Sequence, residues 1–303
     1  MIESPQASIV FEPLPTEDPD STLNKDPESV DAKLQPITAS FRGTIRLLNS
    51  VGGRAARFRG LAIFIANIIA VNWISSMIAF VPFVPRALSN IVASVICAQL
   101  SLTWTHIVIS EPSPKRWFRR LPPMKMWRKV AVPTAVLAVA EQITAFVPIY
   151  IALLTGISNK KAQDFADMTP GQSTGMAFGG FGLLVLGIVL GCFLVLPANV
   201  VLTRVQASLL NDAEETIVPF DRSFGGKVIP EIVGGSGVVT MLDAWRTFDW
   251  ASLIRLGKTY GKVFAMQVAV STLFTLVLVA EVFMIVGKDW SKLIPSDGAK
   301  PEV

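Results

Sequence analysis

The stretch VPTAVLAVAEQITAFVPIYIALL, residues 132 to 154, decides the fold class of this chain. Glu141 is its only charged residue, and nearly all the others are apolar. About 20 such residues form a helix long enough to cross a hydrocarbon layer of ~30 Å. A helix satisfies its own backbone hydrogen bonds in lipid, which an isolated strand does not. The stretch therefore predicts a membrane-spanning helix that carries a carboxyl group near its centre.

The composition of the whole chain extends this prediction. Of its 303 residues, 51% are hydrophobic, and the mean hydropathy is +0.51. This is more apolar sequence than one soluble core of this size requires. We therefore expect an all-α integral membrane protein.

Apolar runs of suitable length predict a bundle of about five transmembrane helices. The flanking segments differ from them in composition. Residues 1–40 contain eight acidic and two basic residues without apolar periodicity, which predicts a disordered segment and neither a secretory signal nor an import presequence. Residues 41–60 form a basic amphipathic juxtamembrane segment, residues 61–287 the polytopic domain and residues 288–303 a tail. The predicted spans are 61–82, 87–109, 130–154, 178–203 and 263–286, with a long loop over 204–262.

Basic residues next to the spans predict the orientation, because Lys and Arg resist translocation. They concentrate before the first span and in the 110–129 and 204–262 loops. With five spans, these three segments share one side, which we expect to face the cytosol. The endoplasmic reticulum or another endomembrane is the favoured location, and the mitochondrial inner membrane is the alternative.

Four polar residues fall at about one depth when each span is counted from its cytosolic end. We expect them to form a polar layer near the bilayer centre, because polar side chains in lipid pair with one another. In one reading Glu141 is a protonated acid that donates to Gln99 or Asn72; in the other it titrates and relays a proton or binds a cation or polar substrate. The candidate layer consists of Asn72, Gln99, Glu141 and Thr275.

Few residues of the sequence could form a catalytic or metal-binding site. Cys97 and Cys192 both lie in predicted spans, and His106 is the only histidine. Neither a zinc site nor a nucleophile with its base follows from these positions. The stretch FGGKVIPEIVGGSGVV, residues 224–239, lacks the order of a phosphate-binding loop. We expect no enzymatic activity, no cofactor, no metal ion and no nucleic-acid partner.

The stretch FDWASLIRLGKTYGK, residues 248–262, predicts an amphipathic helix in the headgroup region that leads into the last span. Arg255, Lys258 and Lys262 lie on its polar face, where anionic lipid headgroups are the expected contacts. Control of topology by positive charge is the alternative role. In residues 41–60 a similar pattern is expected to break at Gly52 and Gly53.

Two further patterns concern packing. Gly187 and Gly191 have a small-xxx-small spacing, which predicts a close helix contact within the chain or in a homodimer. The stretch LTWTHIVISEPSP from Leu102 resembles LTRVQASLLNDAEE from Leu202, and each leads through a loop to an aromatic-basic step before the next span. This similarity suggests a parallel internal repeat, and span-end composition explains it nearly as well.

The order of VVLTRVQASLL, then DAWRTFDW, then a basic step into another span is similar to polytopic bacterial inner-membrane proteins. The chain as a whole resembles a group of fungal multi-span membrane proteins without an established activity. Some of these are labelled ubiquitin-carrier or ubiquitin-conjugating proteins. Such an activity needs a soluble domain with an accessible cysteine, and both cysteines here lie in predicted spans.

The sequence thus predicts a non-enzymatic membrane scaffold, or a partner-binding protein, whose basic cytosolic face engages anionic lipid. The alternative is a small transporter or channel that uses the polar layer around Glu141.

Overall fold

The computed structural model describes residues 40–159, 168–229 and 231–286. The predicted disordered segment, except for Ser40, and the predicted tail lie outside the described residues. The chain divides into two units, one ending at Phe248 and the other beginning at Asp249, and each is described by itself. All regular elements in the described ranges are helices, and the one extended pairing there is an isolated antiparallel bridge between Ser110 and Thr216. The all-helical prediction is confirmed for this part of the chain.

Four described helices are long and apolar enough to cross a membrane, namely Arg54–Ala79, Met124–Leu154, Pro170–Ser208 and Trp250–Ile285. A fifth candidate is a pair of shorter helices, Arg86–Ile96 and Ala98–Ile109, which meet at an angle of 55°. Counting this pair as one span gives five. Length and composition thus agree with the predicted number of apolar helices.

The juxtamembrane segment folds as two short helices. Helix α1 (Phe41–Gly52) has Ser40 as its N-cap, and the Ser40 hydroxyl accepts a hydrogen bond from the backbone amide of Gly43. It ends where Gly53 adopts a φ of +64°, and the 3₁₀ helix η3 (Arg54–Phe58) follows. The predicted break at Gly52 and Gly53 is confirmed, since a positive φ cannot continue a right-handed helix.

The second predicted span is not one continuous helix. Helix α2 (Leu61–Ala79) turns back into α3 (Arg86–Ile96), which bends at Cys97 into α4 (Ala98–Ile109). The predicted span over 87–109 thus corresponds to two helices that meet at 55°. At the bend, the indole nitrogen of Trp127 donates 2.8 Å to the carbonyl oxygen of Val95, which supports the interrupted backbone.

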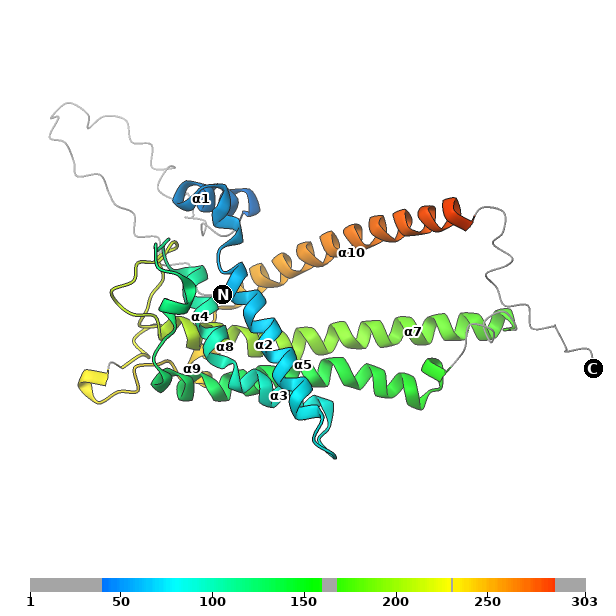
Figure 1. The fold of residues 1–303 in the computed structure, drawn as a ribbon, viewed down its shortest axis with the longest axis horizontal. Helices are drawn as coiled ribbons and strands as arrows, with labels where there is room; N and C mark the ends of the chain where they lie inside the picture. Colours follow the sequence, from blue (N-terminus) through cyan, green and yellow to red (C-terminus); the bar gives the residue numbers. More distant parts are fainter. Residues whose placement is uncertain (1–39, 160–167, 230, 287–303) are drawn as a thin grey trace, which may run out of the picture. The chain divides into compact units, whose positions relative to one another are not determined.

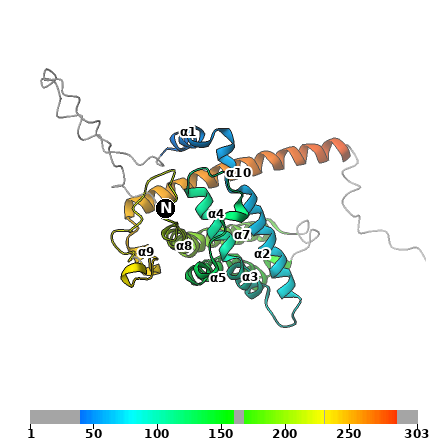
Figure 2. The ribbon, with the colours of Figure 1, turned by 60° about the vertical axis from the view of Figure 1, so that its left-hand side comes forward.

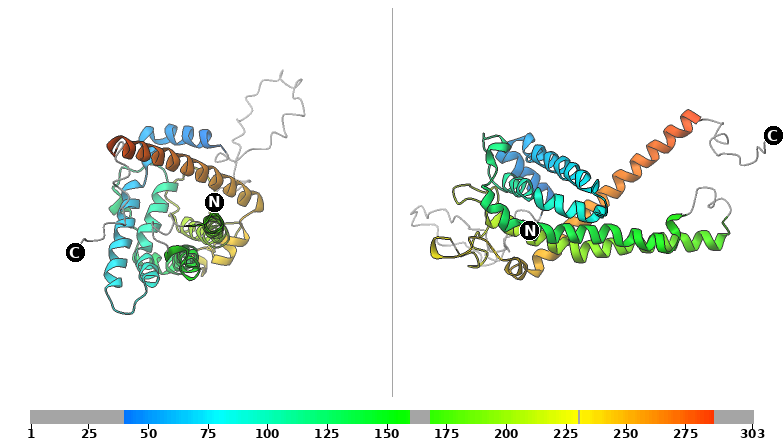
Figure 3. Two further views of the ribbon diagram at one scale, coloured as in Figure 1. Left: turned by 90° about the vertical axis from the view of Figure 1, so that its right-hand side faces the viewer. Right: turned by 60° about the horizontal axis from the view of Figure 1, so that its bottom comes forward.

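Two long helices run side by side in Figure 1, and the left panel of Figure 3 views them nearly end-on. Helix α5 (Met124–Leu154) starts six residues before the predicted span and keeps Pro133 and Pro148 in its interior. After η5 (Ile157–Asn159), helix α7 (Pro170–Leu190) passes through the π-helical turn η6 (Gly191–Val195) into α8 (Leu196–Ser208). Pro197 lacks an amide hydrogen, which accounts for the irregular turn just before it.

Helix α4 lies at the centre of the first unit and contacts α2, α5 and α8 (Figure 2). Its Leu102 is fully buried and belongs to the same core cluster as Leu202 of α8 and Val130 of α5. Helices α4 and α8 are therefore in contact, and the segments after their carboxyl ends form the bridge between Ser110 and Thr216. The two stretches that suggested an internal repeat thus lie against each other.

The segments beyond these carboxyl ends form what we call the loop end, defined as residues 110–123 and 209–240. It contains the 3₁₀ turns η4 (Trp117–Arg120) and η7 (Glu231–Val233) and is followed by α9 (Met241–Arg246). The predicted loop over 204–262 is shorter than expected. Helix α8 continues to Ser208 because its last turns are buried, and a helix resumes at Trp250.

The second unit contains α10 (Trp250–Val286), a single helix of 37 residues. It joins the predicted amphipathic segment and the predicted fifth span without a break. Gly257 and Gly261 do not interrupt it, because isolated glycines weaken a helix by only ~1 kcal/mol.

Candidate functional site

The predicted polar layer is not assembled by the described residues of the first unit. The side-chain amide of Asn72 donates 2.9 Å to the carbonyl of Ile68 in its own helix. Gln99 donates to the carbonyl of Pro122 in the loop end. Glu141 is exposed on the surface of α5, and no described residue forms a hydrogen bond with its carboxyl group. The expected bond from Glu141 to Gln99 or Asn72 is therefore not formed, and the amides of Asn72 and Gln99 donate to backbone carbonyls instead.

A different set of polar side chains connects the helices next to Glu141. The hydroxyl of Ser75 in α2 donates 2.5 Å to the amide oxygen of Asn90 in α3. The amide nitrogen of Asn90 in turn approaches Gln142 Oε1 in α5 at 3.4 Å. One residue along a helix is a rotation of about 100°, so Gln142 faces the neighbouring helices where Glu141 does not. The inward polar position in α5 was thus missed by one residue.

Thr275, the fourth member of the predicted layer, lies in the second unit. Its hydroxyl donates 2.9 Å to the carbonyl of Ser271, one turn earlier in α10. The Thr275 hydroxyl therefore has its hydrogen-bond acceptor within its own helix.

Gln206 of α8, a polar side chain that is almost completely buried, was not singled out from the sequence. Its Oε1 accepts 2.6 Å from the Thr105 hydroxyl, and its Nε2 donates 3.1 Å to Ser101 Oγ. The backbone carbonyl oxygen of Gln206 lies 2.8 Å from Nε2 of His106. His106 is thus a buried packing residue, and the network fixes the register of α4 against α8. The similarity between LTWTHIVIS and LTRVQASLL is the sequence feature that could have indicated this network, because Thr105 and His106 lie in the first stretch and Gln206 lies in the second.

Arg204 is also buried at the end of α8. Its Nη2 donates 2.8 Å to the hydroxyl of Thr247, and its guanidinium lies over the rings of Phe224 and Phe248 at 4.8 and 5.6 Å. Aromatic faces attract a cation, which offsets part of the cost of burying it. Arg204 therefore attaches the end of the loop to the helices.

Ion pairs and backbone bonds hold the loop end together. Nη2 of Arg120 lies 2.8 Å from Glu214 Oε2, and 2.7 Å from the Ser110 hydroxyl. Lys129 and Lys125 in the first turns of α5 both donate to the carboxylate of Glu231. The hydrogen bond from Lys129 and then the bond and charge of Lys125 lower the pKa of Glu231. The basic first turns of α5 are therefore joined to the far part of the loop.

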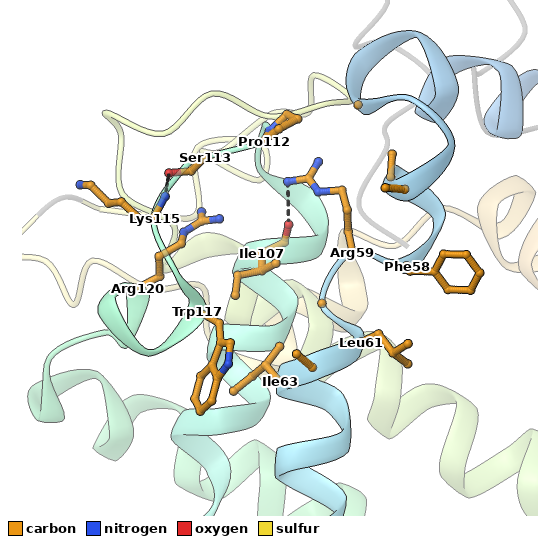
Figure 4. Close-up of a pocket in the computed structure, with 15 residues that line it drawn as sticks. Phe58, Arg59, Leu61, Ile63, Ile107, Pro112, Ser113, Lys115, Trp117 and Arg120 are labelled. Atoms are coloured by element: carbon orange, nitrogen blue, oxygen red, sulfur yellow. Dashed lines mark hydrogen bonds between the residues drawn. The ribbon is translucent and has the colours of Figure 1, made fainter.

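A cavity of about 350 Å³ opens between η3, the start of α2, the end of α4 and residues 112–120 (Figure 4). Its wall includes three basic residues, Arg59, Lys115 and Arg120, and the apolar side chains of Ile63 and Trp117. In Figure 4 the guanidinium groups of Arg59 and Arg120 lie on the cavity's side of the loop, whereas Lys115 extends away from them. The two guanidinium groups repel each other across this space.

One buried side-chain donor beside this cavity lacks an acceptor among the described residues. Nη2 of Arg59 donates to the carbonyls of Ile107 at 3.1 Å and Ser110 at 2.6 Å, whereas the buried Nη1 has no partner among the described residues. Helix α2 begins here after Gly60, which has no side chain to cap the first amides. Uncapped amides and the helix dipole make this terminus attractive to an anion.

Reactive groups are sparse in the described residues. No three His, Cys, Asp or Glu side chains within the described ranges are grouped so that they could hold a metal ion. Cys97 is buried at the bend between α3 and α4, and Cys192 is exposed in η6; neither forms a disulfide.

The glycines predicted to allow a close helix contact have different surroundings. A Cβ added to Gly187 would lie 3.9 Å from Pro148 of α5, so Gly187 takes part in packing within the chain. A Cβ added to Gly191 would meet no described atom within 4 Å. A homodimer through this surface remains a prediction.

The predicted lipid contacts on α10 share one face of the helix. Arg255, Lys258 and Lys262 are spaced three and four residues apart, which places them one above another. The Arg255 guanidinium also donates 2.7 Å to Ser252 Oγ. These positions satisfy the geometric requirement for a basic interfacial stripe.

Comparisons with protein-family models, with curated proteins and with solved structures found no match for this chain. The resemblance stated from the sequence therefore stays a prediction, and function must be inferred from the site itself.

Proposed function

We propose that this chain is a multi-pass membrane protein without catalytic activity, which acts as a membrane scaffold or partner-binding protein through a basic face that engages anionic lipid. The loop end and the basic turns of α10 would lie at the cytosolic headgroup region. The endoplasmic reticulum or another endomembrane is the proposed location, with the mitochondrial inner membrane as the alternative.

One observation carries this proposal. Basic residues from segments far apart in sequence lie next to the ends of long apolar helices: Arg59 before α2, Arg120 before α5, and Lys125 and Lys129 in its first turns. Clustered Lys and Arg at the end of a span attract anionic headgroups at about 1 kcal/mol per residue. The stripe of Arg255, Lys258 and Lys262 repeats this chemistry on a second element.

The stripe on α10 supplies a direct test. Detergent-solubilised protein would be mixed with liposomes of phosphatidylcholine alone or with phosphatidylserine, and capture would be measured at low and high salt. Changing Arg255, Lys258 and Lys262 to Gln should reduce the excess capture by phosphatidylserine several-fold at low salt. Arg255→Lys, Lys258→Arg and Lys262→Arg keep the charge and should bind as the wild type does. Equal capture by the neutral and charge-retaining variants would refute the proposal for this face.

A further inference from the structure

The cavity beside Arg59 differs from the general basic face, because it is hollowed and lined on several sides. We propose that it is a binding site for the phosphate of an anionic phospholipid, with the headgroup held by Arg59, Arg120 and the first amides of α2. This inference rests on the proposed function, because it identifies one lipid class and one site within that basic face.

The first support is the balance of charge. Arg120 has one carboxylate partner, Glu214 at 2.8 Å, whereas no salt bridge is formed by Arg59 or Lys115 within the described residues. Arg59 and Arg120 repel each other, and the attraction between Glu111 and Arg59 offsets part of this repulsion. A phosphate between them would carry at least one negative charge and reduce this repulsion.

The second support is the surplus of donors. A buried guanidinium nitrogen without an acceptor is unfavourable, and Arg59 Nη1 is in this position. A phosphate oxygen bound beside Arg59 would supply an acceptor to this guanidinium, whose Nη2 is already held by the carbonyls of Ile107 and Ser110. The amides of Leu61, Ala62 and Ile63 point from the uncapped start of α2, a helix of 19 residues. Two independent donor groups thus converge on one cavity.

The third support concerns the apolar part of the ligand. Phe58 and Leu61 line the cavity and are 69% and 45% exposed, respectively. Figure 4 shows both at the side of the cavity away from the loop, where α2 begins its apolar course. Acyl chains leaving a headgroup in the cavity would pass these side chains and continue along α2. A phosphate with two acyl chains therefore fits better than a free anion.

The test uses the full chain in a neutral detergent and short-chain lipids. Dioctanoyl phosphatidic acid should bind saturably with one site per chain, and Arg59→Gln should weaken that binding at least tenfold. Arg54→Gln, five residues earlier in η3 and outside the cavity, is the matched control and should bind as the wild type does. Equal weakening by Arg54→Gln would show a diffuse charge effect and overturn the site.

Two further arms separate the sources of phosphate. Inorganic phosphate should compete weakly, and dioctanoyl phosphatidylcholine should not compete. Equal affinity for inorganic phosphate would overturn the lipid assignment. Phosphatidic acid with a photoreactive acyl chain should cross-link the wild type at residues 58–63 or 112–120, which does not depend on any variant folding. Cross-links confined to other segments would overturn the site, while loss of capture by the α10 variant would still support the proposed function.

Discussion

The indole Nε1 of Trp127 donates a hydrogen bond of 2.8 Å to the carbonyl oxygen of Val95. This bond joins the beginning of α5 to the end of α3, at the point where the chain bends by 55° into α4. A backbone carbonyl that is not fully paired in a helix becomes acceptable because a side chain supplies the donor.

Trp127→Phe should therefore destabilise the first unit while keeping an aromatic ring in place. The half-buried Val95 carbonyl would lose its side-chain donor, and a hydrogen bond of this kind contributes ~0.5–1.5 kcal/mol. Thermal unfolding of both proteins in detergent measures this loss as a lower melting temperature of the variant. Trp73→Phe, at a side chain that is 66% exposed, is the control and should change little. An equal effect of both substitutions would show that the bond to Val95 contributes nothing specific.

Gln206 and Thr105 provide a test of how α4 and α8 are held in register. Gln206→Leu and Thr105→Val should each destabilise the protein by about 1–3 kcal/mol, because each leaves a buried partner unsatisfied. The double variant should lose less than the sum of the two, since it removes both partners. Gln267→Leu, on the exposed surface of α10, controls for the loss of an amide. Strict additivity would contradict a direct coupling between the two side chains.

Gly60→Ala should destabilise the protein through backbone strain and crowding together. Gly60 has the left-handed φ of +75° and ψ of −1°, where an alanine is strained by ~1–2 kcal/mol. A Cβ at residue 60 would also lie 3.0 Å from Trp104 Cδ1 and 3.1 Å from Val108 Cγ2. Thermal unfolding in detergent should therefore show a lower melting temperature for the variant than for the wild type. An unchanged melting temperature would contradict the close approach of Trp104.

The contact of Glu231 with Lys129 and Lys125 should depend on pH. The pKa of Glu231 is lower in the folded protein than in the unfolded chain, so the stabilisation is present above the unfolded pKa of ~4.3 and is lost as the pH falls through the folded value. Amide hydrogen exchange of residues 231–239, corrected for intrinsic rates, should rise between pH 5 and the acid limit. Glu231→Gln should exchange faster already at pH 7 and show no such transition. A transition of unchanged size in that variant would assign the effect to another group.

Glu141→Gln distinguishes the proposed scaffold from the transport alternative. Because no described residue bonds to the Glu141 carboxyl, the substitution should leave the unfolding free energy within ~0.5 kcal/mol of the wild type. Proton flux into proteoliposomes, followed with an enclosed pH-sensitive dye, should be absent in the wild type and the variant alike. A wild-type flux that Glu141→Gln abolishes would instead favour transport.

The long apolar helices could be predicted from sequence because span length and hydropathy act locally. The bend at Cys97 could not, since neither Pro nor Gly marks it and its support comes from the bond of Trp127 to Val95, which lies 32 residues earlier in the chain. The predicted contacts of Glu141 within the first unit are not formed for a related reason. Counting residues along a span gives the depth of a side chain, but not the direction in which it points, and Glu141 and Gln142 point in different directions. The cavity depends on Arg59 and Arg120, which the sequence identified only as members of basic segments.

The Gln206 network also sets an order of events during synthesis. Ser101, Thr105 and His106 leave the ribosome about a hundred residues before their partner Gln206. At ~5–20 residues per second, α4 must wait roughly 5–20 s for α8. Until then the polar side chains of α4 have no partner in α8. Because unpaired polar groups are unfavourable in lipid, we expect α4 to remain near the translocon or the membrane surface during this time. Biogenesis of this chain is therefore completed late, when the second half arrives and provides the hydrogen bonds that the first half lacks.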